Sequence, residues 1–169
     1  MTFRDLKSNE IDVRIATLNE KGATLLLYKD ARVDMDILDE TVGAMNWQRK
    51  HSRDNANCTV EIWDNEKKQW VSKEDTGTES FTEKEKGLAS DSFKRACFNW
   101  GIGRELYTAP FIWISADKMQ LTEKQGKITT YDKFRVEAIE ITNKEITGLA
   151  IKNNRNERVF LYKKNSKED

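Results

Sequence analysis

The chain has 169 residues, 37% hydrophobic and 34% charged, and its 29 Lys and Arg balance 29 Asp and Glu. This length suits a domain with a buried core, and an aromatic content of 9% argues against a disordered polypeptide. No apolar run approaches the roughly 20 residues that span a bilayer, and the first residues lack the apolar segment of a signal peptide. We therefore expect a soluble cytoplasmic protein with no membrane partner. A net charge of zero, taken alone, argues against a nucleic-acid partner.

The first third of the chain contains both alternating and helical patterns of apolar residues. Ile11, Val13 and Ile15 alternate with polar residues, which is typical of a half-buried strand. Helical spacing from Val33 to Val42, followed by Gly43 at the C-cap position, predicts a helix. The elements expected here are a short helix at 2–9, strands at 11–15 and 23–28, and a helix at 33–42.

The middle of the chain predicts an antiparallel meander followed by a long helix. The alternating stretches are 47–53, 58–63 and 70–76. We expect their tryptophans to lie on the packed face of the sheet. Thr82 and Glu85 have the spacing of a capping box, which predicts a helix over 83–100.

Beyond Pro110 the pattern returns to alternation and predicts a second meander, with a polar tail from Lys163 that we expect to be frayed. Its strands are expected at 111–114, 134–142, 145–152 and 157–162. The fold class predicted from the whole chain is α+β: an antiparallel β-sheet meander packed on a central helix, with a C-terminal β meander.

The cysteine and histidine content limits metal and nucleophile chemistry. Two cysteines and His51 cannot supply a four-ligand zinc site. A Cys–His pair is formally available, but Cys97 falls on an apolar stripe and Cys58 begins a strand, so we expect two buried thiols. Gly101–Gly103 is only a fragment of a phosphate-binding motif. We therefore expect no cofactor, no metal and no enzymatic activity.

The helix over 83–100 separates an apolar stripe from a basic one. At about 100° per residue, one quadrant holds the residues that we expect to pack on the sheet: Ala89, Phe93, Ala96, Cys97 and Trp100. The opposite arc holds Asp91, Lys94, Arg95 and Phe98. Cations that neutralise phosphates beside a ring that stacks on a base suit a nucleic-acid strand. The alternative is that Lys94 and Arg95 are solvated charges and that Phe98 packs against a neighbouring element or subunit. Taken without the rest of the chain, this helix favours that alternative.

Charge is segregated along the chain. Residues 44–53 carry cations without an acid, and residues 54–93 carry ten acids against five lysines. Residues 94–107 carry a net +2, and residues 152–167 carry six cations against one acid. Such blocks can form a basic groove on a neutral protein, or complementary faces that meet between identical subunits.

The segment from Ala89 to Tyr107, ASDSFKRACFNWGIGRELY, resembles the hallmark helix of the Rad-fifty-two-type single-strand annealing proteins, especially the phage Sak-like and bacterial ones. Upstream, YKDARV at 28–33 and GAMNW at 43–47 resemble the family's strand, helix and Gly-x-x-x-Trp passage. Val60 to Gly77 resembles its hairpin. The resemblance covers about residues 11–107. We expect a single domain over 1–169, with an annealing-protein core at 11–107, a C-terminal β extension at 108–162 and a frayed tail at 163–169.

The resemblance implies a β-β-β-α core that binds single-stranded DNA and anneals complementary strands without ATP in recombination and repair. It also implies assembly into a ring or helical filament. The family's Lys-Arg pair corresponds to Lys94 and Arg95, and its strand aromatic to Tyr28, with Arg32 following. Phe98 stands where the family commonly has a basic residue.

From the charge blocks and the resemblance together, we expect DNA contacts from Lys94, Arg95, Arg49, Lys50, Arg53, Tyr28, Arg32, Phe98 and Arg104. The expected partners are single-stranded DNA, further copies of this chain and a single-strand binding protein, in the cytoplasm of a bacterial or phage-infected cell. Two alternatives stay open. One is a protein-interaction module without DNA affinity. The other is a metal-dependent nuclease using Asp34, Asp36, Asp39 and Glu40, which we expect instead to form a solvated acidic helix face.

Overall fold

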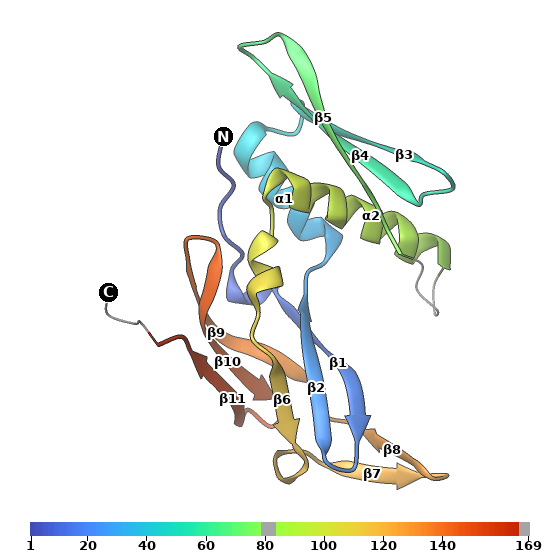
Figure 1. The fold of residues 1–169 in the computed structure, drawn as a ribbon, viewed down its shortest axis with the longest axis vertical. Helices are drawn as coiled ribbons and strands as arrows, with labels where there is room; N and C mark the ends of the chain where they lie inside the picture. The colour runs from blue at the N-terminus through green and yellow to red at the C-terminus, as the bar shows by residue number, and fades with distance from the viewer. Residues whose placement is uncertain (79–83, 166–169) are drawn as a thin grey trace. The chain divides into compact units, whose positions relative to one another are not determined.

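In the computed structural model, residues 1–78 and 84–165 are described, and they fall into two structural units (Figure 1). Unit 1 holds the described residues of 1–4 and 30–104, and unit 2 holds those of 5–29 and 105–169. Both helices and all strand pairs of the described chain give a mixed α+β fold with antiparallel sheets, as expected. Residues 12–28 pair with one another and with C-terminal strands, and they belong to unit 2.

Unit 1 consists of a three-stranded sheet and two helices. Its elements are α1 (Ala31–Val42), β3 (Trp47–Ser52), β4 (Asn57–Asp64), β5 (Gln69–Thr76) and α2 (Lys84–Trp100), with strand order β3-β4-β5. The expected apolar stripe of α2 is confirmed at Phe93, Ala96 and Cys97, which are fully buried. The start of the capping box, Thr82, lies outside the described residues.

The central strand β4 shows why this unit folds. Cys58, Val60 and Ile62 alternate with polar residues and are fully or almost fully buried, because β4 has a neighbour on each side and α2 packs on it. The expectation that the tryptophans share the packed face was wrong for Trp63 and Trp70. The register pairs these two residues with each other, and the alternation turns them to the face opposite Ile62.

Helix α1 begins and ends at the residues that its sequence indicates. The Asp30 side chain accepts the N–H of Arg32 at 2.8 Å, and Gly43 ends the helix with φ 86°, a left-handed conformation that suits glycine. Ile37 and Leu38 are fully buried. The expected acidic face was wrong at Asp34, which is also fully buried.

Unit 2 is built around a six-stranded sheet that joins the N-terminal and C-terminal strands. In spatial order its strands are β11 (Arg158–Lys163), β10 (Glu145–Asn153), β9 (Phe134–Thr142), β1 (Asp12–Asn19), β2 (Gly22–Tyr28) and β6 (Ile112–Ser115). A separate hairpin is formed by β7 (Leu121–Lys124) and β8 (Lys127–Thr130). Its two strands were missed because each is only four residues long and no residue of either is buried.

The expected helix over residues 2–9 was wrong. The segment contains a single 3-10 turn, η1 (Ser8–Glu10), in which Glu10 accepts the N–H of Lys7 at 2.8 Å. Phe3 and Leu6 have helical spacing, yet one belongs to unit 1 and the other to unit 2, and each is buried. A segment this short gains too few helical hydrogen bonds to compete with burial of its two apolar side chains. At the C-terminus, β11 ends at Lys163, and residues 166–169 of the expected frayed tail lie outside the described residues.

Candidate nucleic-acid interface

Helix α2 carries Lys94 and Arg95 away from its buried stripe. Both residues are half-buried. The Nε atom of Arg95 lies 3.6 Å from a carboxylate oxygen of Asp75 on β5, and among the described residues this buried Nε–H has no hydrogen-bond acceptor. Lys94 has no ion-pair partner in the described part of the chain. The pair therefore retains positive charge that a phosphate can neutralise.

Strand β3 adds a third cation beside α2. The guanidinium carbon of Arg49 lies 4.6 Å from the centroid of the Phe93 ring, which also stacks on Trp47 at 6.1 Å. Arg49 remains exposed while its side chain covers Phe93, an arrangement in which a cation is attracted to the face of the ring. Arg49 therefore contacts α2 on the side of its buried stripe, at Phe93.

Two of the expected residues near Arg49 have other surroundings. Lys50 points to the opposite side of β3 and pairs with Glu61 on β4 at 2.9 Å. The Lys50 hydrogen bond is the main cause of the lowered pKa of Glu61. Arg53 lies in the β3–β4 turn with φ 50°. This outer face of the sheet also carries the Glu74 carboxylate, whose pKa is lowered first by the hydrogen bond from Thr59.

The glycine-rich exit of α2 caps the helix. The N–H of Gly101, which has φ 95°, donates to the carbonyl of Phe98 at 2.9 Å. The guanidinium of Arg104 donates to the carbonyls of Phe98 and Asn99 at 2.8 and 3.1 Å. A cation at the last carbonyls stabilises a helix C-terminus, so Arg104 has a local structural role. The Phe98 side chain is half-buried.

Tyr28 and Arg32 belong to different units. Tyr28 ends β2 in unit 2, is 39% exposed, and has the guanidinium carbon of Arg14 5.9 Å from its ring centroid. Arg32 lies in the first turn of α1 in unit 1 with its side chain exposed, and its Nε is 3.4 Å from a carboxylate oxygen of Asp30.

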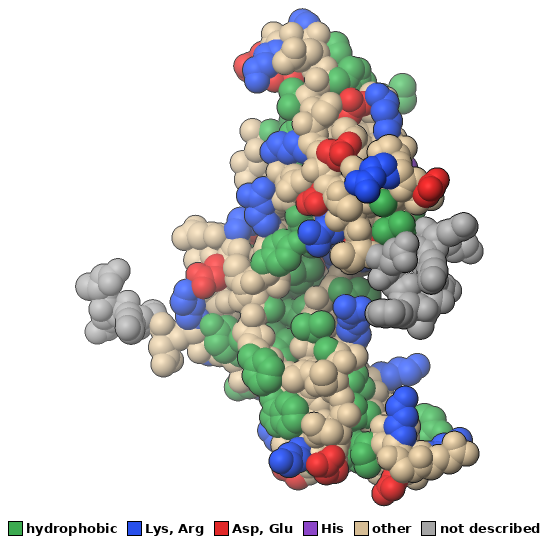
Figure 2. Space-filling view, turned by 45° about the vertical axis from the view of Figure 1, so that its right-hand side comes forward, with side chains coloured by type: hydrophobic (Ala, Val, Ile, Leu, Met, Phe, Trp, Pro, Cys, Tyr) green, Lys and Arg blue, Asp and Glu red, His purple; other side chains and the backbone are tan. Residues whose placement is uncertain are grey.

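The basic C-terminal block is largely neutralised by acids of its own sheet. Lys152 and Arg158 both pair with Glu137, at 3.0 and 2.7 Å, and the hydrogen bond from Arg158 is the main reason that the pKa of Glu137 falls to about 2. Arg155 pairs with Asp132, which is almost fully buried. In Figure 2, Lys and Arg side chains lie among Asp and Glu side chains and form no single continuous patch on the face shown.

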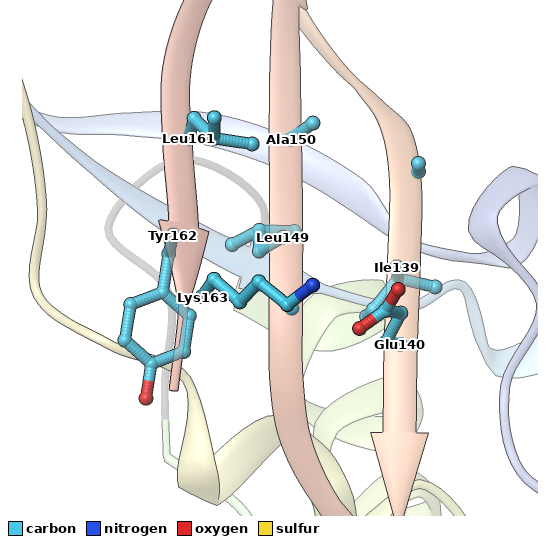
Figure 3. Close-up of a pocket in the computed structure, with 9 residues that line it drawn as sticks. Ile139, Glu140, Leu149, Ala150, Leu161, Tyr162 and Lys163 are labelled. Carbon is cyan, nitrogen blue, oxygen red and sulfur yellow. The ribbon is translucent and has the colours of Figure 1, made fainter. Parts of the chain in front are cut away.

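Unit 2 has a hollow of about 210 Å³ on β9, β10 and β11 (Figure 3). Small residues, Gly148 and Ala150, form part of its lining, and Leu161 lines it from β11. Figure 3 shows Lys163 and Glu140 reaching toward one another across β10. The charged residues of the lining are one cation, Lys163, and one anion, Glu140.

A buried polar contact that the sequence did not indicate lies beside α2. Ser92 is fully buried and donates its hydroxyl to the carbonyl of Asn55 at 2.9 Å, while its Oγ is 3.4 Å from Nδ1 of His51. Burial is the main cause of the lowered pKa of His51. Ser92 thus ties the β3–β4 turn to α2, and no alternating or helical pattern marks it.

Two of the four acids considered for a nuclease site accept hydrogen bonds from other residues. Asp39 accepts the indole N–H of Trp47 at 2.6 Å, and Glu40 accepts the Nε–H of Arg4 at 2.6 Å. Within residues 1–78 and 84–165, no three His, Cys, Asp or Glu side chains gather in a way that could hold a metal ion. No helix in these ranges combines the length and the apolar character needed to cross a membrane.

No family model matches this chain, no curated protein matches it, and no solved structure matches it.

Proposed function

We propose that this protein binds single-stranded DNA and anneals complementary strands without ATP, as the Rad-fifty-two-type annealing proteins do. The observation that carries the proposal is the set of three cations on two elements of unit 1: Lys94 and Arg95 on α2, and Arg49 on β3. The Arg49 side chain contacts Phe93 of α2, so the strand that carries Arg49 meets the helix that carries the other two cations. These cations, together with the resemblance of residues 89–107, support DNA binding over the alternatives.

The mechanism needs positioning and charge, and no bond is made or broken. Lys94, Arg95 and Arg49 hold phosphates of one strand, and the release of condensed counterions drives binding. Because these cations contact the backbone, the Watson–Crick edges of the bases stay free for a complementary strand. Repetition of these cations in a ring or helical filament extends the bound strand over several subunits.

The direct test mixes two labelled complementary oligonucleotides with the protein and no nucleotide. We expect annealing faster than in buffer, with a rate that declines as salt rises over roughly 50–200 mM, the range in which phosphate contacts weaken. A rate equal to that of buffer at every salt concentration would refute the proposal.

A double variant tests the site. Lys94→Ala with Arg95→Ala is expected to weaken single-strand binding and to lower the slope of log Kd against log salt by about one to two. The matched control is Lys124→Ala with Lys127→Ala, which removes two exposed cations from the β7–β8 hairpin. If both double variants lower the slope equally, the α2 cations are not a specific site.

A protein-interaction module is the second candidate, and the exposed apolar side chains favour it. The most exposed are Tyr131 at 84%, Phe111 at 77%, Leu161 at 67% and Tyr107 at 66%, besides Met1 and Met45. All four belong to unit 2 and offer apolar surface that a protein partner can cover. Light scattering distinguishes the two functions: assembly without DNA affinity supports this candidate over annealing.

A further inference from the structure

One face of the β1–β2–β6 part of unit 2 carries exposed apolar side chains. Phe111 is 77% exposed, Leu26 47%, Tyr28 39% and Trp113 37%. The same strands bury Ala23, Leu25, Ile112 and Ile114 on their other face. In Figure 2 hydrophobic side chains lie open in the lower part of the view, where Figure 1 places β2 and β6. Core formation therefore does not explain these four residues.

The strand register brings the four side chains together. Thr24 pairs with Trp113 and Leu25 with Ile112, and continuing this register sets Leu26 beside Phe111. Tyr28 is two residues beyond Leu26 and so shares its face. We call Leu26, Tyr28, Phe111 and Trp113 the aromatic strip. Two residues of the strip that follow one another on the same strand, such as Leu26 and Tyr28, are separated by two residue rises, or about 6.7 Å. This distance is about twice the 3.4 Å rise between stacked bases.

Two contacts hold the Trp113 and Tyr28 rings of the strip in place. A Cβ atom added to Gly22 would lie 2.9 Å from the Trp113 ring, so this ring packs directly on the β2 backbone. Arg14, which pairs with Leu26 in the register, sets its guanidinium carbon 5.9 Å from the Tyr28 ring centroid. Rings fixed in advance lose little conformational entropy when a ligand binds.

We propose that the aromatic strip is a base-stacking surface for single-stranded nucleic acid, to which Phe111 and Trp113 contribute. The inference rests on the proposed function and assigns DNA contacts to β6 and to Phe111, which directly precedes it, in addition to the cations of α2 and β3. Rings spaced by two residues accept the flat faces of bases, and Arg14 supplies a cation for a neighbouring phosphate. Stacking engages base faces and leaves Watson–Crick edges free, as annealing requires. Apolar contact with a second copy of this chain is the competing use of the same face.

The experiment compares Phe111→Ala with the wild-type protein on two labelled strands: oligo-dT and an abasic strand of equal length. Fluorescence anisotropy measures Kd. We expect about tenfold weaker binding of oligo-dT by the variant, from the loss of one stacked base, and unchanged binding of the abasic strand. The salt slope is expected to stay that of the wild type, because no phosphate contact is lost. Trp113→Thr is expected to act in the same way, and Phe111→Trp to retain wild-type affinity.

Tyr131→Ala is the matched control, since Tyr131 is 84% exposed and follows β8 outside the strip. Thermal unfolding checks that each variant is folded, and Phe111 is exposed enough for its removal to leave the core intact. Equal losses on oligo-dT and the abasic strand, or no loss on either, would overturn base stacking. A fall in particle mass without DNA, with unchanged affinity per chain, would assign the strip to a second copy. If the wild-type protein binds neither strand, the proposed function fails, and the strip with it.

Discussion

Phe93 is the residue on which the core of unit 1 can be tested most directly. Its side chain is fully buried between α2 and the sheet, stacks on Trp47 at an interplanar angle of 24°, and is covered by Arg49. Phe93→Ala removes the ring and leaves a cavity, which typically costs about 3–5 kcal/mol. The ring pair and the cation each add about 0.5 kcal/mol, taken at the low end because Trp47 is only half-buried and Arg49 is exposed. We expect a total loss of about 4–6 kcal/mol in the free energy of unfolding.

Urea unfolding followed by tryptophan fluorescence measures this loss, because four of the five tryptophans belong to unit 1. With an m-value of about 2 kcal/mol per M, a loss of 5 kcal/mol lowers the midpoint by about 2.5 M. Since whole domains are stable by only about 5–15 kcal/mol, the alanine variant can be unfolded in water. Phe93→Leu then serves as the second measurement: it keeps most of the volume and is expected to cost about 1–2 kcal/mol. Losses below about 1 kcal/mol for both variants would refute the packing of α2 on this ring.

Three further predictions concern titratable groups. Burial raises the pKa of the Cys58 thiol to about 11. A thiol reagent at pH 8 is therefore expected to leave Cys58 unmodified in the folded protein and to modify both cysteines in urea. Rapid reaction of Cys58 without urea would contradict its burial. Burial lowers the pKa of His51, so the unfolded chain takes up a proton near pH 6.5 before the folded one does. Stability is therefore expected to fall as the pH drops below about 6.5, less steeply in His51→Gln, and identical pH profiles would exclude this cause. Glu137 has a pKa of about 2 in the folded protein against 4.5 when unperturbed. Its contribution to stability is thus full above pH 4.5 and is lost as the pH falls toward 2; a carboxyl titration by NMR with a midpoint near 4.5 would contradict the pairing with Arg158.

Much of the local structure followed from periodicity. The Asn-Lys turn at 143–144 was expected from sequence, and both residues adopt positive φ between β9 and β10. The apolar stripe of α2 and the C-cap Gly43 were also expected, because a buried helix face requires apolar residues at helical spacing and a left-handed cap favours glycine. Strands β7 and β8 have no such sequence pattern, since no residue of either is buried.

The sequence predicted which residues carry the positive charge of the candidate site, but it predicted only part of what surrounds each of them. Lys94 and Arg95 were expected on the open arc of α2, and the structure adds that Asp75 lies near one of them. Arg49 and Lys50 are adjacent in sequence and were grouped together, yet strand alternation sends them to opposite faces of the sheet. Charge counts along a chain cannot distinguish such neighbours, because they ignore the direction of each side chain.

Residue spacing was enough to predict an antiparallel α+β fold, two buried thiols and a helix with separate apolar and basic arcs, since each depends on spacing within one element. The contacts between elements became known from the three-dimensional fold. It paired β2 with β6, about ninety residues later, and so set Trp113 beside Thr24 and exposed the aromatic strip. It also set Glu137 between Lys152 and Arg158, which neutralised a block that is basic in sequence. Contacts between distant strands are governed by register and sheet order, and neither leaves a local pattern in the chain.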